Sequence, residues 1–196
     1  MEMYTYLIIG TIFWTLLSIY YYYASDKMSK KSRNFINFTH AVGIILAYLI
    51  GLNENYIYKW SVSYYAYDII QNIINMSNLF QIGMLFHHII TIYILNFLEI
   101  EQLSSYIIFG FYLTELSNLP MYITKYFNYI NCNPLLMKFM TILEILFFGY
   151  FRFYLGNKIL YKIYSLGYIN YTFFVPVIIL EILNLFWLNK LKKQIF

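Results

Sequence analysis

Two adjacent histidines, His87 and His88, lie inside an apolar stretch of the chain, and Thr91 follows one helical turn later. Neighbouring residues on a helix point about 100° apart, so both rings can border one cavity but only one can point straight into it. With a carboxylate on another helix, an imidazole can act as a general base or accept an acyl group. The pair therefore predicts acid–base or nucleophilic chemistry, with a structural role as the alternative.

Metal binding is a weaker interpretation of the same residues. Zinc sites on a helix place two histidines four residues apart so that both rings share a face, and adjacent histidines do not meet this requirement. The single cysteine, Cys132, offers neither a disulfide nor a zinc-binding spacing. We therefore expect no metal and no bound cofactor.

Asp68 begins a second polar group, on the preceding apolar stretch. Asp68, Gln71, Asn72 and Asn75 follow i, i+3, i+4, i+7 spacing, which places them on one face of a helix. An ionisable residue in the middle of a membrane helix is costly, so this face must look into the protein. It forms either the lining of a functional cavity or a polar seam that bonds neighbouring helices.

Three later apolar stretches also carry polar residues near their middle. These residues are Glu115 and Asn118, then Glu144 and Arg152, and finally Glu181 and Asn184. Polar groups that converge inside an apolar bundle resemble a site for a molecule with an apolar tail and a polar head. We expect Arg152 to meet an anionic head group or to pair with a carboxylate.

The elements that must position these residues are membrane helices. Hydrophobic residues make up 61% of the 196 residues and charged residues only 11%, far below the roughly 25% of a soluble domain. In lipid the backbone must be hydrogen-bonded within each segment, so the spans are helices. Seven spans are predicted, at about 3–24, 34–52, 62–76, 83–98, 104–122, 135–155 and 168–189.

The basic residues predict the orientation of these spans. If the N-terminus is outside, nine Lys and Arg residues fall in cytosolic segments and three on the other side. This bias agrees with the positive-inside rule and places the N-terminus in the lumen or exterior and the C-terminus in the cytosol. It also explains the net charge of +4 without a nucleic-acid partner, and none is expected.

Six short motifs in order resemble the TLC-domain family, which includes ceramide synthases and translocating-chain-associating membrane proteins. The resemblance runs from about Arg33 to Lys193. The motifs are Arg33 to His40, Trp60 to Asp68, His87-His88 with Thr91, Glu115 to Asn118 with Lys125, Arg152, and Leu183 to Trp187.

This resemblance implies an all-α barrel of six membrane helices around a lipid-accessible cavity, here with one additional N-terminal span. It divides the chain into residues 1–32, a span and a basic loop, and a TLC domain at 33–196. It also implies the endoplasmic reticulum or a related membrane.

In ceramide synthases the paired histidines and two aspartates are needed for N-acylation of a sphingoid base by acyl-CoA. His87 and His88 match the histidine pair, whereas Glu115 and Asn118 stand at the aspartate positions and Thr114 where a further histidine is usual. With one acid replaced by an amide, the chain is most similar to the small TLC-domain proteins, which resemble lipid-handling factors.

Two functions are therefore predicted. In the first, the protein binds or handles membrane lipid in a cavity lined by polar residues: His40, Asp68, Asn72, Thr91, Asn118, Arg152 and Asn184. In the second, it is an N-acyltransferase that uses fatty acyl-CoA, with His87 or His88 as base or acyl acceptor and Glu115 orienting the imidazole.

Overall fold

The computed structural model describes residues 2–24, 29–74, 79–168 and 170–192, and nearly all of them are helical. The elements are α1 (Glu2–Ala24), α2 (Ser29–Leu49), α3 (Glu54–Ile74), α4 (Leu79–Leu95), η1 (Asn96–Glu99), α5 (Glu101–Tyr129), α6 (Pro134–Phe148), η2 (Gly149–Leu155), α7 (Gly156–Ser165) and α8 (Tyr171–Lys192). The π-helical stretch η2 joins α6 to α7 without a break. The described residues therefore form seven long helical segments, with η1 as a short 3-10 turn between α4 and α5.

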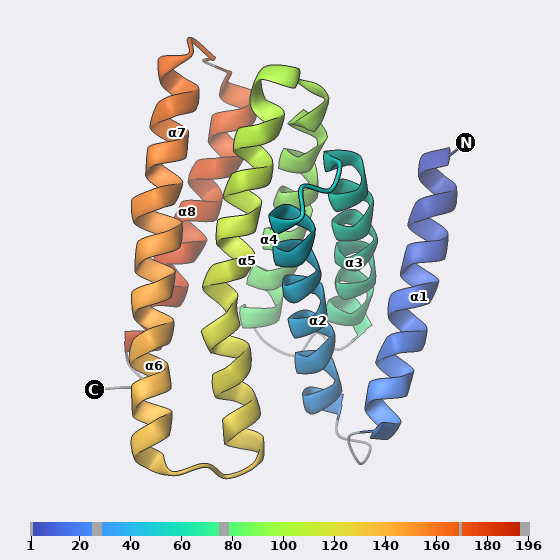
Figure 1. Cartoon of the computed structure of the whole chain (residues 1–196), viewed down its shortest axis with the longest axis vertical. Coiled ribbons are helices and arrows are strands. Elements are labelled where there is room, and N and C mark those ends of the chain that lie inside the picture. The colour runs from blue at the N-terminus through green and yellow to red at the C-terminus, as the bar shows by residue number, and fades with distance from the viewer. Residues whose placement is uncertain (1, 25–28, 75–78, 169, 193–196) are drawn as a thin grey trace.

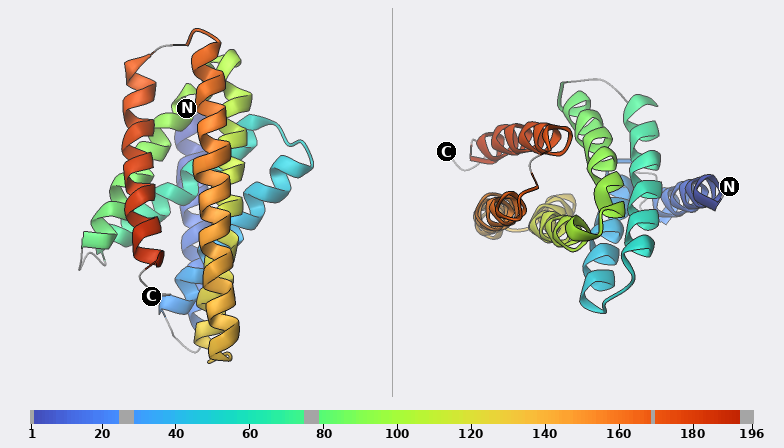
Figure 2. Two further views of the ribbon diagram at one scale, coloured as in Figure 1. Left: turned by 90° about the vertical axis from the view of Figure 1, so that its left-hand side faces the viewer. Right: turned by 90° about the horizontal axis from the view of Figure 1, so that it is seen from above.

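Six of these segments close into a ring. α2 packs on α5, α5 on α6, α6 on α8, α8 on α4, α4 on α3, and α3 on α2. α1 stays outside this ring and packs against α2 and α3, as the views from the front and from above show (Figures 1 and 2). The predicted fold, an all-α barrel of six helices with an additional N-terminal helix, is confirmed.

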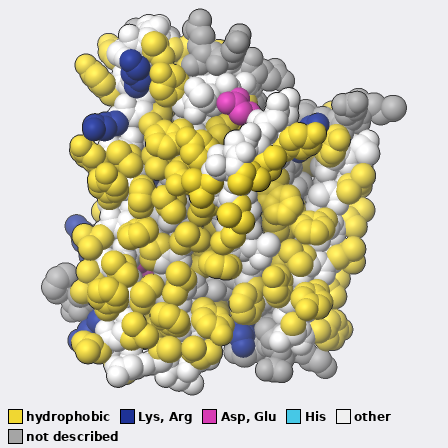
Figure 3. Space-filling view, viewed as in Figure 1, with side chains coloured by type: hydrophobic (Ala, Val, Ile, Leu, Met, Phe, Trp, Pro, Cys, Tyr) yellow, Lys and Arg dark blue, Asp and Glu magenta, His cyan; other side chains and the backbone are white. Residues whose placement is uncertain are grey.

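The outward-facing side of the helices is apolar. Ile8, Leu46, Phe86, Leu146 and Ile182, from five different helices, are each at least half exposed. Hydrophobic side chains also cover most of the face seen in Figure 3. In water such a surface would be unstable, whereas in a bilayer it faces the acyl chains. The protein is an integral membrane protein.

Four segments are long and apolar enough to cross a membrane: Tyr4–Ala24, Gln81–Leu98, Pro134–Ser165 and Tyr171–Lys192. α2, α3 and α5 fall below this limit. Their ionisable residues His40, Asp68 and Glu115 are almost fully buried, so these helices present their polar groups to the protein interior. Average hydropathy underestimates such helices because it counts residues that never meet lipid.

Three helices are clearly longer than the sequence predicts, and one of them, α5, continues to Tyr129, seven residues beyond its predicted end at 122. α3 begins at Glu54, eight residues before the predicted span, and the helix after Pro134 continues to Ser165, ten residues beyond its predicted end. The extension beyond Leu155 is amphipathic. Ile163 is buried while Lys158 and Lys162 are exposed, so a window that requires continuous apolar residues ends too early.

A close contact fixes α1 to the ring. Gly10 lies so near Ser63 on α3 that a Cβ atom would not fit without a shift. One turn later, the fully buried Trp14 donates a hydrogen bond from Nε1 to Ser63 Oγ at 3.2 Å. The small residues Gly10 and Ser63 thus allow α1 to approach α3, as is common where membrane helices pack.

Candidate functional site

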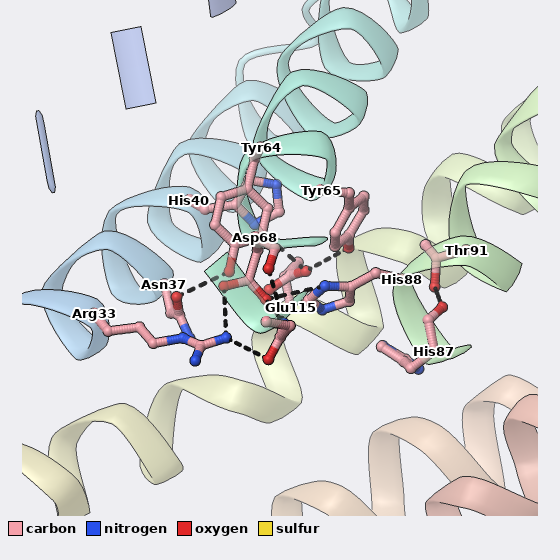
Figure 4. A network of polar contacts seen from close by, with 11 residues as sticks. Arg33, Asn37, His40, Tyr64, Tyr65, Asp68, His87, His88, Thr91 and Glu115 are labelled. Atoms are coloured by element: carbon pink, nitrogen blue, oxygen red, sulfur yellow. Dashed lines mark hydrogen bonds and ion pairs between the residues drawn. The ribbon is translucent and has the colours of Figure 1, made fainter. Parts of the chain in front are cut away.

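Asp68 joins α2, α3 and α4. Its side chain is 1% exposed, and its Oδ1 accepts a hydrogen bond from Arg33 Nη2 at 3.0 Å. Asn72, one turn along α3, donates to Asp68 Oδ2 at 2.8 Å and accepts from the same Arg33 nitrogen at 2.7 Å. His88 Nδ1 lies 3.1 Å from Asp68 Oδ2. Figure 4 shows this group closing around the carboxylate.

Glu115 is the centre of a second cluster, on α5. Its Oε1 accepts a hydrogen bond from Tyr65 at 3.2 Å and lies 3.7 Å from His40 Nδ1, while its Oε2 accepts from Asn118 at 3.3 Å. The His40 ring stacks on Tyr64, with the ring centres 3.8 Å apart. These aromatic neighbours hold the imidazole in place without a direct bond to the Asp68 group.

Arg152 connects α5 to α8. Its Nε donates to Ser117 Oγ at 2.8 Å, its Nη2 to Asn118 Oδ1 at 2.7 Å and its Nη1 to Asn184 Oδ1 at 2.6 Å. All three acceptors are uncharged, although the carboxylates of Glu115 and Glu181 act on the guanidinium electrostatically. The guanidinium has five N–H groups, so two of them have no recorded partner among the described residues.

Arg152 owes its position to η2. A π-helical turn inserts one residue relative to an α-helix and rotates the side chains that follow, and such turns are frequent at functional sites. Here it turns Arg152 into the ring, where 6% of the residue is exposed. The side-chain hydrogen bonds of Arg152 go to Ser117 and Asn118 on α5 and to Asn184 on α8.

A cavity of about 140 Å³ lies between α3, α4, α5, α8 and the continuous η2–α7 segment. Its polar lining is formed by His87, Thr91, Thr114, Arg152, Glu181 and Asn184, and its apolar lining includes Ile94, Leu95, Ile107, Phe111, Ile159, Leu160, Ile163, Phe173 and Val177. Along α7 and α8 the apolar lining residues lie nearer the α7–α8 connection than Arg152, Glu181 and Asn184 do, and along α4 and α5 they lie nearer the α4–α5 connection than His87 and Thr114 do. Both connections are at the upper end of the bundle in Figure 1. The cavity therefore has a polar end and an apolar shaft.

The two adjacent histidines point to different places. His88 faces Asp68, whereas His87 borders the cavity and packs edge-on against Trp187, with the ring centres 5.0 Å apart. Figure 4 shows His87 beside Thr91, which donates a hydrogen bond to the His87 carbonyl oxygen at 2.8 Å. One histidine thus belongs to the cavity and the other to the ion-pair group.

Two buried polar atoms around the cavity, His87 Nδ1 and Glu181 Oε2, have no hydrogen-bond partner in the part of the chain that the structure describes. Buried polar groups are nearly always bonded to protein, water or ligand, so unpaired atoms at a cavity wall indicate that something polar binds there. His87 is only 9% exposed, so bulk water does not satisfy it.

The predicted site residues thus fall into two neighbouring groups and a cavity. Asp68, Asn72 and His88 come together, as do His40, Glu115 and Asn118, and the cavity takes His87, Thr91, Arg152 and Asn184. The prediction that Glu115 orients the catalytic imidazole is not what the contacts show, because Asp68 contacts His88 and Glu115 contacts His40. Asn75, the fourth residue of the predicted polar face, lies outside the described residues.

Three neighbours of the site were not predicted from the sequence. They are Arg33, which pairs with Asp68, Tyr65, which bonds to Glu115, and Ser117, which bonds to Arg152. Tyr65 stands three residues before Asp68, on the same helical face, and this spacing could have identified it. A tyrosine is compatible with lipid, however, and so gave no signal of burial. Within the described residues, no three His, Cys, Asp or Glu side chains gather as a metal site would require.

A family model described as the TLC domain matches residues 6–193, so the match includes α1 as well as the six-helix ring. No curated protein and no solved structure matches the chain.

Proposed function

Since the chain belongs to the TLC-domain family, we propose that it binds a membrane lipid inside the ring, with the polar head against His87, Arg152 and Asn184 and the acyl chain along the apolar shaft. The observation that carries this proposal is the division of the cavity into a polar end and an apolar shaft. Such a lining matches an amphipathic molecule and would be costly to leave empty.

The cavity volume limits the ligand to one chain. About 140 Å³ is close to the size of a protein cavity that admits a single benzene molecule. It therefore holds a head group and the first part of one acyl chain, and the rest of the chain must leave between helices. A lipid with two chains would have to displace the helices that line the shaft.

Gly110 offers a test of lipid binding. A leucine here would extend into the shaft, where a Cβ atom already reaches 3.8 Å from Ile159 Cδ1. We expect Gly110→Leu to reduce labelling of the cavity helices by a photoactivatable single-chain lipid by at least about tenfold, measured in nanodiscs by peptide mapping.

Gly83→Leu is the matched control. Gly83 lies on α4 but not at the cavity, and a Cβ atom there meets nothing within 4 Å. Both substitutions favour helix formation, so neither should prevent folding. Equal labelling of the two variants would contradict a lipid site in the shaft.

N-acyl transfer is the second candidate, favoured by the unpaired, buried imidazole of His87 at the polar end. His87 would take the proton from an amine as its nitrogen attacks the acyl-CoA carbonyl and the CoA thiolate leaves, or would itself accept the acyl group first. The contact between His88 and Asp68 would hold α4 in register. A sphingoid base and a fatty acyl-CoA are the substrates that the family suggests.

His87→Ala/His88→Ala tests this second candidate. We expect N-acylation, assayed with acyl-CoA and a sphingoid base in membranes that lack other ceramide synthases, to fall at least about 100-fold in the double variant. His87→Ala alone should account for most of the loss. Full activity in a folded double variant would exclude a catalytic role for the two histidines. No activity in the wild type would contradict the proposal that the protein is an acyltransferase.

We place the protein in the endoplasmic reticulum or a related membrane, with its N-terminus in the lumen. The exposed Lys138, Lys190 and Lys192 support this orientation, because they lie at the ends of α6 and α8 that would face the cytosol.

A further inference from the structure

Among the described residues, Glu181 is the one carboxylate that lines the cavity. It lies on α8, one turn before Asn184, whose amide also accepts the hydrogen bond from Arg152. One carboxylate oxygen, Oε1, lies next to Gly156, and the other, Oε2, is buried without a hydrogen-bond partner. An ionised carboxylate only accepts hydrogen bonds, so Oε2 requires a donor from the ligand.

The charges at the polar end do not favour an anionic ligand. Taken alone, Arg152 would suggest a carboxylate or a phosphate. The carboxyl groups of Glu115 and Glu181, however, act electrostatically on Arg152, and in their ionised form they balance its positive charge. A second carboxylate placed next to Glu181 would add a like charge in a region from which water is largely excluded.

The available hydrogen-bonding groups define a different head. Among the described residues, two N–H groups of Arg152 have no acceptor and can donate to a ligand. Glu181 Oε2 can accept a hydrogen bond, and His87 Nδ1 can donate or accept one according to its tautomer. A head that satisfies all three carries both a carbonyl oxygen and a hydroxyl group. We propose that the ligand is an uncharged, hydroxylated single-chain lipid of the monoacylglycerol type, and that Glu181 selects it over a free fatty acid. This inference rests on the proposed lipid site.

The test compares two ligands that share one acyl chain. A photoactivatable fatty alcohol labels purified protein in nanodiscs, and monooleoylglycerol or oleic acid competes for the site. We expect monooleoylglycerol to compete about tenfold better than oleic acid on the wild type, the effect of one buried hydrogen-bonding group left unpaired. Glu181→Gln should reduce this preference to about threefold or less, because the amide can donate to a carboxylate and carries no charge.

Glu144→Gln is the matched control, since Glu144 is a buried glutamate that does not line the cavity, whereas Glu181 is half-buried at its wall. It should keep the wild-type preference. Equal or better competition by oleic acid on the wild type, or a preference that Glu181→Gln leaves unchanged, would overturn the role of Glu181 while leaving lipid binding intact. Failure of the fatty alcohol to label the cavity helices in the wild type would instead overturn the lipid site, and the inference with it.

Discussion

Arg152→Ala is expected to lower the free energy of unfolding by about 3–5 kcal/mol, the usual cost of removing one partner from a buried charged network. The substitution leaves the hydrogen-bond acceptors of Ser117, Asn118 and Asn184 without their donor. It also leaves Glu115 and Glu181 without the positive charge that balances them. Reversible unfolding in mixed detergent micelles would measure the change.

Two further variants separate the guanidinium from the charge alone. Arg152→Lys keeps the charge, but a lysine presents one point charge where the arginine reaches acceptors on two helices, so it should recover only part of the loss. Lys158→Ala removes an exposed cation from the same continuous helix and should change stability by less than about 0.5 kcal/mol. An Arg152→Ala protein as stable as Lys158→Ala would show that the network does not hold α5 to α8.

Composition and the spacing of apolar stretches predicted the number of long helices and the all-α class. These features depend on the bilayer, which demands helices of a certain length wherever apolar residues accumulate. The ends of α3 and α7 were predicted less well, because amphipathic extensions such as Gly156–Ser165 bury one face and expose lysines on the other.

The polar residues themselves were predictable because each breaks an apolar stretch. Their partners were not, since partners depend on how each helix is rotated about its axis. The π-helical η2 is the clearest case. Arg152 lies within it and bonds to Asn118 and Asn184, and no spacing in the sequence predicts a π-helical turn at this place. The spacing of His87 and His88 likewise does not predict which ring borders the cavity and which one contacts Asp68.

Different residues of α3 bond to neighbouring helices and line the cavity. Asp68 and Asn72 bond to α2 and α4 and form the seam that holds the ring together. Tyr65, one turn earlier, lines the cavity and contacts Glu115. Of the two alternatives for the predicted polar face, the contacts of Asp68 and Asn72 favour the structural seam, because neither residue lines the cavity. Tyr65, which does, was not part of the predicted face.

Asp68→Ala should therefore reduce stability by about 3 kcal/mol, because it removes the carboxylate that Arg33, Asn72 and His88 all contact. Arg33→Ala should cost only about 1 kcal/mol, since the Arg33 side chain is 29% exposed and its loss can be compensated by water. The same micelle unfolding assay would measure both variants.

The double variant Arg33→Ala/Asp68→Ala then isolates the pair. If the two residues interact directly, its loss should be smaller than the sum of the single losses by at least about 0.5 kcal/mol, because each single variant already removes the contact between them. If the two losses in the free energy of unfolding are additive, Asp68 acts mainly through His88 on α4. Its contribution to stability would then lie in the contact between α3 and α4 and not in the one between α2 and α3. If Asp68→Ala lowers the free energy of unfolding no more than Arg33→Ala does, the seam is contradicted. The contacts of a carboxylate that is only 1% exposed would then not contribute to stability.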